Sequence, residues 1–290
     1  MVFASLITYA QAIVLGLLQG FSELFPISSL GHSVILPGLL GWDIHQNDNF
    51  FLAFLVATHL ATALVLLGFF WSDWVRIVRG LGRSIRDREV AGDADAQLGW
   101  LIVVATIPAG LLGLAFEHAL RSVFASPTAA AAFLVCNGLM LFGAERLRRG
   151  VPVRVGTDYS DERISRDLSV REAVGVGAAQ AIALLPGFSR SGAAMSGGLL
   201  AGLSNEDSAR FAFLLATPII GAAAVLKLPD LLGSQGDGVR GPALAGALCA
   251  ALTAYLSVRF LVRYFETNRL TPFAIYCTIA GALSLIALSL

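Results

Sequence analysis

Charged residues are scarce in this sequence. Asp, Glu, Lys and Arg together make up 14% of its 290 residues, whereas 56% are hydrophobic, and the mean hydropathy is +0.75. A soluble domain carries about 25% charged residues, so this composition excludes an ordinary soluble fold and predicts an integral membrane protein. The 20 basic and 20 acidic residues balance. No basic excess therefore indicates a nucleic-acid partner.

Cysteine and N-terminal basic residues are scarce as well. Cys136, Cys249 and Cys277 lie in apolar runs without ligand spacing, which argues against a disulfide framework or a zinc site. No Lys or Arg precedes Arg76, so we expect no cleavable signal peptide. The apolar runs are continuous rather than alternating, which favours helical spans over a β-barrel.

Six apolar stretches approach the ~20 residues that a helix needs to cross the hydrocarbon core. They lie at about 50–71, 99–116, 127–144, 211–228, 242–262 and 271–290. Two other apolar regions, about 4–41 and 170–204, are interrupted midway by Pro, Gly and Ser. Because Pro removes a helical donor and Gly relaxes the backbone, we predict a re-entrant helix–break–helix element in each, sheltered inside the protein.

The two broken regions match each other at an offset of 161 positions. The identities are Ala12/Ala173, Gly16/Gly177, Gln19/Gln180, Leu24/Leu185, Ser28/Ser189 and Gly31/Gly192. They predict one membrane domain over 1–290, with repeat one at about 1–145, a cytoplasmic linker at about 146–169 and repeat two at about 170–290. Three spans follow each broken element, so the repeats have inverted topology. Inverted repeats bring broken helices together near the membrane midplane.

Arginine placement predicts the orientation of the chain. The stretches 72–98 and 145–171, expected to be loops, carry Arg76, Arg79, Arg83, Arg86, Arg88, Arg146, Arg148, Arg149, Arg154, Arg163, Arg166 and Arg171. The alternate loops hold only Arg121 and Arg240. The positive-inside rule therefore predicts that the arginine-rich loops are cytoplasmic, and that both termini and the first broken element lie at the outer face.

Polar groups in the first broken region are candidates for function, because such groups are costly at membrane depth. Gln19 and Glu23 stand one helical turn apart, so they share a face; alternatively, Glu23 only lines an aqueous mouth. Ser28, Ser29 and His32 would supply a nucleophile, a proton carrier and free helix-end amides. A cap and a buried hydrogen-bonded pair would explain the same residues. His59, in the next span, is expected to be a polar contact between helices.

Arg190 is the strongest signal in the second broken region. It is flanked by Ser189 and Ser191 and followed by a helix expected to start near Gly192. A guanidinium binds phosphate at two points, and a helix N-terminus adds amide donors, so this turn predicts an oxyanion site. The alternative, an internal ion pair with Glu23, leaves the serines and the glycine unexplained.

Two motifs carry a family resemblance. They read Gln19-Gly-Phe-Ser-Glu23-Leu-Phe-Pro-Ile-Ser-Ser29-Leu-Gly-His32 and Pro186-Gly-Phe-Ser-Arg190-Ser-Gly192. They resemble the signature motifs of undecaprenyl-diphosphate phosphatases, the BacA or UppP bacitracin-resistance family. The resemblance runs through the whole chain, as far as Pro272-Phe-Ala-Ile-Tyr276.

The resemblance implies hydrolysis of undecaprenyl diphosphate to the monophosphate carrier used in cell-wall synthesis. It implies a divalent cation, Mg²⁺ or Ca²⁺, and a site open to the outer face of the bacterial cytoplasmic membrane. By motif position, Ser29 and His32 are the proposed nucleophile and proton-transfer residue, Glu23 is the retained acid, and Arg190 grips the diphosphate. The substrate-binding set is Gln19, Ser28, Ser189, Arg190, Ser191 and Gly192.

One departure affects the expected metal site. Many members have Glu where this chain has Gln19, so this chain lacks the second carboxylate for a cation. Glu23, the Gln19 amide oxygen and substrate phosphates would instead supply the ligands.

Three further points bound the function. The expected partners are a polyprenyl diphosphate lipid and the bilayer, with a homodimer left open. A type-2 phosphatidic acid phosphatase needs a second histidine shortly after its arginine, and none follows Arg190. A polyprenyl-phosphate transporter or flippase is the alternative that the inverted repeats favour.

Overall fold

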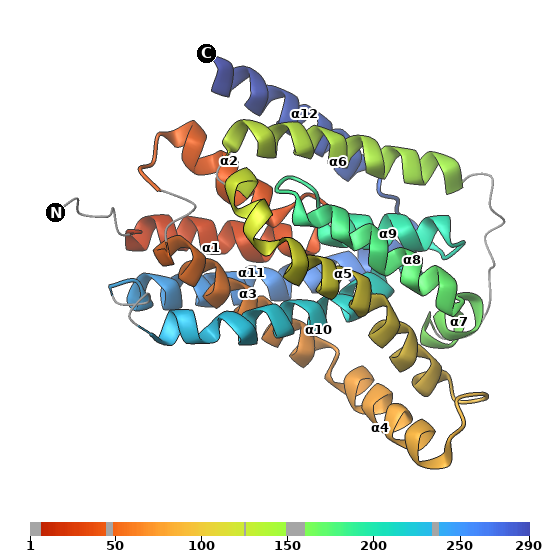
Figure 1. The fold of residues 1–290 in the computed structure, drawn as a ribbon. Coiled ribbons are helices and arrows are strands. Elements are labelled where there is room, and N and C mark those ends of the chain that lie inside the picture. The colour runs from red at the N-terminus through yellow and green to blue at the C-terminus, as the bar shows by residue number, and fades with distance from the viewer. Residues whose placement is uncertain (1–6, 45–48, 125, 149–159, 234–237) are drawn as a thin grey trace.

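The computed structural model describes residues 7–44, 49–124, 126–148, 160–233 and 238–290 (Figure 1). Within these residues every regular element is helical and no strand occurs. The elements in chain order are α1 (Tyr9–Leu24), α2 (Ser29–Leu40), α3 (Asn49–Phe69), α4 (Trp71–Asp87), α5 (Ala94–Phe124), α6 (Pro127–Arg148), α7 (Ser160–Asp167), α8 (Val170–Gln180), η1 (Ala181–Leu184), α9 (Arg190–Leu200), α10 (Asn205–Leu232), α11 (Arg240–Thr267) and α12 (Thr271–Ser289). The expected all-α class is confirmed.

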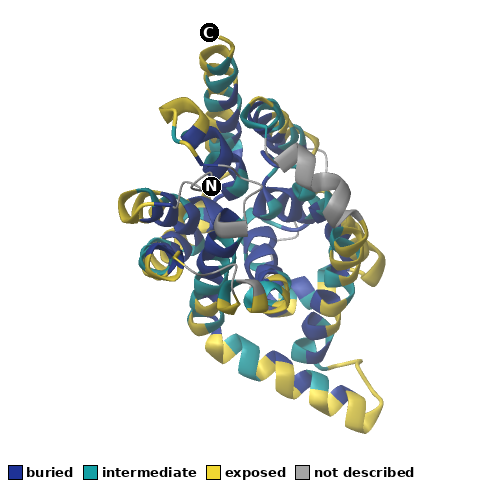
Figure 2. Cartoon of the chain, turned by 60° about the vertical axis from the view of Figure 1, so that its left-hand side comes forward, coloured by how far each residue is buried: buried dark blue, intermediate teal, exposed yellow. Residues whose placement is uncertain are grey.

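Six helices of the described chain are long and apolar enough to cross a membrane: α3, α5, α6, α10, α11 and α12. They coincide with the six predicted spans. Large hydrophobic side chains remain exposed on them, such as Leu114 at 66% and Leu244 at 62%. Figure 2 shows exposed and partly exposed residues on the outer faces of the bundle around a buried interior. This surface suits a bilayer, so the chain is a polytopic membrane protein.

Both predicted broken elements are present. α1 ends at Leu24 and α2 begins at Ser29, while α8 and η1 end at Leu184 and α9 begins at Arg190. Each second helix starts at an N-cap serine. Ser28 accepts a hydrogen bond from Gly31 N, and its counterpart Ser189 accepts one from Gly192 N. α9 therefore begins two residues before Gly192, near which its start was expected.

The first helix of each broken element packs closely on a spanning helix. α1 lies against α11 and α8 lies against α5. A Cβ on Gly16 would collide with the backbone of Gly246, and a Cβ on its counterpart Gly177 would collide with the backbone of Ala105. Both crossings therefore depend on the absence of a side chain. The two crossings share this close contact, and the repeats and their inversion across the membrane stay predictions.

The arginine-rich stretches were expected to be loops, and this expectation was wrong. They contain the helices α4 and α7. α4 turns Ile77, Gly80 and Ser84 toward the protein and packs on α5. Its opposite side is charged, so no long apolar run indicated a helix. Both helices lie at the end of the bundle opposite the start of α1 and the end of α12 (Figure 1). Arg149 and Arg154 of the predicted linker lie outside the described residues.

Candidate active site

Glu23, in the last turn of α1, is the centre of the candidate site. Its side chain is buried. Gln19 Nε2 donates a hydrogen bond to Glu23 Oε2 at 2.9 Å, so the two residues share one face as predicted. Ser29 Oγ donates to the same carboxylate oxygen, and Arg190 Nη2 donates to Oε1 at 2.7 Å. One carboxylate thus joins residues from both broken elements.

Arg190 lies in the first turn of α9 and is separated from Glu23 by 167 positions in the chain. The predicted meeting of the two broken elements is therefore observed. The ion pair considered as an alternative is present too, but it uses only one side of the guanidinium. Nη1 is buried and has no hydrogen-bond partner. A buried guanidinium nitrogen without a partner is costly, so an anionic oxygen bound there would satisfy it.

His32, on the first turn of α2, contacts Tyr276 rather than Ser29. Its Nδ1 lies 2.7 Å from the carbonyl oxygen of Ser28, so Nδ1 carries the proton. Nε2 then accepts from Tyr276 Oη at 2.8 Å, and the two rings stack 5.7 Å apart. No hydrogen bond joins His32 to Ser29, whose hydroxyl instead points to Glu23. The sequence indicated a serine–histidine pair; the structure pairs the serine with the carboxylate.

Ser28 has an unusual backbone conformation. Its φ of 69° lies in the left-handed region, which a non-glycine residue adopts at a cost of about 1–3 kcal/mol. The backbone turn places its carbonyl against His32 while its hydroxyl caps α2. Ser28 therefore orients the site through its backbone, and its predicted contact with substrate stays a prediction.

His59, on α3, belongs to the site although its sequence position indicated only a contact between helices. Its Nδ1 donates to Leu55 O at 2.7 Å, and its Nε2 faces the Gln19 amide nitrogen, which can only donate. Gln19 Nε2 lies 3.2 Å from this nitrogen, and Glu23 Oε2 lies 3.5 Å from it. The Gln19 amide group thus bridges His59 and Glu23 with its two N–H donors. An ionisable residue inside a span was the signal that could have placed it here.

Asn137, on α6, fastens the two breaks to each other and was not predicted. The fully buried side chain donates to Pro26 O at 3.0 Å and accepts from Ser189 N at 2.9 Å. The hydroxyls of Ser189 and Ser191 both donate to Phe25 O. These serines therefore hold the first break in place, and their predicted role in binding substrate stays a prediction.

Glycine lets the two breaks touch. A Cβ on Gly31 would lie 2.8 Å from Gly187 Cα, and Gly187 itself has a φ of +108°. A Cβ on Gly192 would press on Pro26 and Leu141 at 3.2 Å. The predicted site glycine Gly192 thus serves close packing at the start of α9.

The residues present fit a hard divalent cation only in part. The described residues contain no group of three or more His, Cys, Asp or Glu side chains that could hold a metal. Gln19 Oε1 is buried without a partner, while Nε2 of the same amide donates to the Glu23 carboxylate. One carboxylate and one amide oxygen suit Mg²⁺ or Ca²⁺ when a diphosphate supplies further oxygens.

Comparison with known proteins gives consistent results. The family model described as "Bacitracin resistance protein BacA" matches residues 12–283. A protein of Mycolicibacterium paratuberculosis called undecaprenyl-diphosphatase is 50% identical over 98% of both chains. One of Frankia alni called undecaprenyl-diphosphatase 2 is 46% identical, covering 96% of this chain and 97% of its own. One of Acidiphilium cryptum called undecaprenyl-diphosphatase is 47% identical, over 95% and 96% respectively.

The matched region includes both helix breaks and every residue placed in the site above. The chain therefore belongs to the bacitracin resistance protein BacA family.

Proposed function

We propose that this protein is a phosphatase that hydrolyses undecaprenyl diphosphate to undecaprenyl phosphate and inorganic phosphate. One observation carries the proposal: Glu23 accepts from both the Ser29 hydroxyl and the Arg190 guanidinium, and Nη1 of that guanidinium is buried without a partner. A guanidinium for phosphate and a serine with its proton acceptor are the components of phosphoryl transfer to an enzyme nucleophile. The names of the relatives support the same substrate.

In the first step, Ser29 Oγ attacks the distal phosphorus of the diphosphate. The phosphoric anhydride bond breaks, and undecaprenyl phosphate leaves with the bond electrons. Glu23 accepts the hydroxyl proton, for which it is already the hydrogen-bond acceptor. Arg190 Nη1 binds the phosphoryl oxygens as negative charge builds on them.

In the second step, water attacks the phosphoserine. His32 Nε2 takes a proton from this water, for which Tyr276 must give up its hydrogen bond to that nitrogen. The Ser29 oxygen leaves and recovers its proton from Glu23. Inorganic phosphate is released, and the His32 proton passes to solvent.

The proposal includes a divalent cation, Mg²⁺ or Ca²⁺, held by Glu23 and by the free Gln19 Oε1. When bound with substrate, the cation neutralises part of the diphosphate charge. The protein residues act as described: Arg190 binds the phosphoryl oxygens, and Glu23 accepts the Ser29 proton.

The proposal also assigns a location. The arginine count favours a site open to the outer face of the bacterial cytoplasmic membrane, with both termini on that side. There the reaction would recycle the lipid carrier for cell-wall synthesis and would confer resistance to bacitracin.

Phosphate release by the purified protein tests the function against the flippase alternative. Detergent-solubilised protein is given undecaprenyl diphosphate and Mg²⁺, and inorganic phosphate and lipid products are measured. We expect one phosphate for each undecaprenyl phosphate formed. A protein that releases no phosphate, yet moves labelled polyprenyl phosphate across sealed vesicles, would be a transporter.

A further inference from the structure

Two arginines of α11, Arg259 and Arg263, have no partner among the described residues. Both side chains are exposed, and they stand one helical turn apart. Like charges at this spacing destabilise a helix slightly. Within the described chain neither guanidinium forms an ion pair or a hydrogen bond, so their charge is left for a ligand outside the protein.

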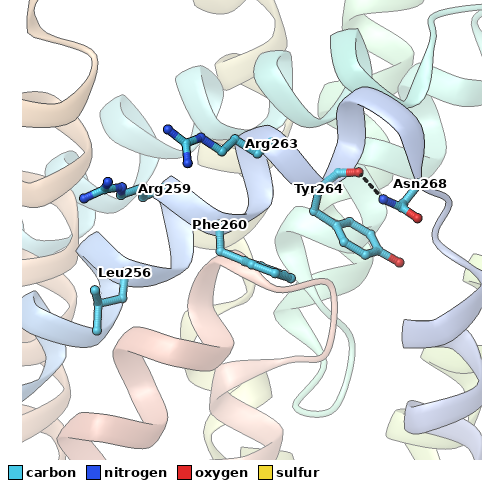
Figure 3. A pocket seen from close by; sticks show the side chains of 6 residues that line it. All are labelled: Leu256, Arg259, Phe260, Arg263, Tyr264 and Asn268. Atoms are coloured by element: carbon cyan, nitrogen blue, oxygen red, sulfur yellow. Dashed lines mark hydrogen bonds between the residues drawn. The ribbon is translucent and has the colours of Figure 1, made fainter.

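The arginines line a cavity of about 450 Å³ on the surface of α11 (Figure 3). Figure 3 shows the two guanidinium groups extending in the same direction. The other lining residues are Leu256, Phe260, Tyr264 and Asn268. The cavity therefore combines two fixed positive charges with an apolar wall, a composition that fits an amphipathic anion.

An exposed apolar stripe continues from the cavity along α11. Its members recur every four residues and are more than half exposed: Leu248, Leu252, Leu256 and Phe260. The stripe covers about 18 Å at the helical rise of 1.5 Å per residue. A stripe of this kind on a spanning helix faces acyl chains, so a lipid tail would lie along it.

The cavity lies at the end of the bundle that carries the arginine-rich stretches 72–98 and 145–171. Asn268, at the end of α11, accepts at its carbonyl from Asn205, the first residue of α10. The Leu270 N–H donates to Glu145 in the last turn of α6. This is the end that the arginine count predicts to be cytoplasmic, where the membrane surface carries anionic lipids.

We propose that this cavity is a binding site for an anionic phospholipid. The phosphate lies between the guanidinium groups of Arg259 and Arg263, and an acyl chain follows the stripe from Phe260 to Leu248. A zwitterionic lipid brings a cationic group to the same two arginines and binds less well. Free phosphate lacks the chain and makes no contact with the stripe.

Lipid retention tests this proposal directly. The purified full chain is titrated with dioleoyl phosphatidylglycerol or dioleoyl phosphatidylcholine in detergent micelles, and bound lipid is counted by native mass spectrometry. We expect phosphatidylglycerol to be retained preferentially and to raise the thermal unfolding midpoint. In the double variant Arg259→Gln, Arg263→Gln, phosphatidylglycerol affinity should fall about tenfold or more.

A matched control removes two arginines from the same end of the molecule. The variant Arg79→Gln, Arg86→Gln changes α4, outside the cavity, and should retain phosphatidylglycerol like the wild type. Both variants change exposed side chains, and circular dichroism verifies their folding. Equal loss in the two variants would overturn the proposal in favour of a general charge effect. Equal retention by the wild type and the Arg259, Arg263 variant would also overturn it, as would equal stabilisation by inorganic phosphate.

Discussion

Glu23 accepts hydrogen bonds from Gln19, Ser29 and Arg190, and these three donors come from the two broken elements. A buried carboxylate is stable only when it is paired and hydrogen-bonded. The interactions that make burial of Glu23 tolerable are therefore the same ones that prepare Ser29 for attack. At the residue scale, stability and proposed chemistry depend on one side chain.

Arg190→Lys should lose most of the phosphatase activity, by about 10²-fold, although the charge is kept. An ammonium cannot both hold Glu23 and present a second, planar donor to the phosphate. Phosphate release at saturating substrate measures the effect, with Arg86→Lys at an exposed position as the control. Near-normal turnover of the Arg190 variant would show that phosphate does not bind there.

Gln19→Glu should not improve the enzyme. The Gln19 amide donates to both Glu23 and His59, and a carboxylate at this position could donate to neither. It would also place a second negative charge beside Glu23, where two carboxylates repel each other. Turnover is measured for both proteins across a range of Mg²⁺ concentrations. A variant with higher activity and tighter cation affinity would support a two-carboxylate metal site.

At the element scale, the broken helices could be predicted because Pro, Gly and Ser interrupt apolar runs. α4 and α7 could not, since their stability comes from charged faces and from packing on other helices rather than from long apolar runs. Contacts between distant parts of the chain could not be predicted within the site either. Asn137 and Tyr276 reach it from 52 and 244 positions away in the chain, and nothing local in the sequence marks such contacts.

Gly177→Ala should destabilise the protein while Gly175→Ala should not. Both glycines lie on α8, but a Cβ on Gly177 would collide with the backbone of Ala105, whereas one on Gly175 meets nothing within 4 Å. Overpacking costs about 1–3 kcal/mol, and replacing an exposed helical glycine by alanine contributes up to ~1 kcal/mol of stability. The thermal unfolding midpoints of the two variants are compared in detergent. Equal midpoints would contradict the close crossing of α8 and α5.

At the scale of the whole molecule, Asp161 connects α7 to the rest of the bundle. Arg76 of α4 donates to it at 2.7 Å, and Arg210 of α10 donates at 2.9 Å. Burial raises the pKa of the Asp161 carboxyl, but the hydrogen bonds and charges of Arg210 and Arg76 outweigh burial, so its pKa is lowered overall. The ionised form of Asp161 is thus the form that stabilises the fold.

Asp161→Asn should lower the free energy of unfolding at pH 7 by about 1–3 kcal/mol, because Arg76 and Arg210 lose the charge of this buried partner but keep their pairing with Asp73. A lowered folded-state pKa gives stability that is present above the unfolded pKa of ~3.9 and lost as pH falls through the folded value. The difference in the free energy of unfolding between variant and wild type should therefore become smaller below about pH 4. Thermal unfolding at several pH values measures it, with the exposed Asp87→Asn as control. A gap independent of pH would contradict the ionised pair.

The most direct test of the proposed site compares Glu23→Gln with Gln19→Ala. Phosphate release from undecaprenyl diphosphate is measured for both variants and the wild type as a function of Mg²⁺ concentration. Glu23→Gln should lose cation-dependent release by about 10²–10⁴-fold, because Ser29 loses its proton acceptor. Gln19→Ala should only reduce release, because the carboxylate remains. An active Glu23→Gln variant beside an inactive Gln19→Ala variant would reverse these roles and contradict the account.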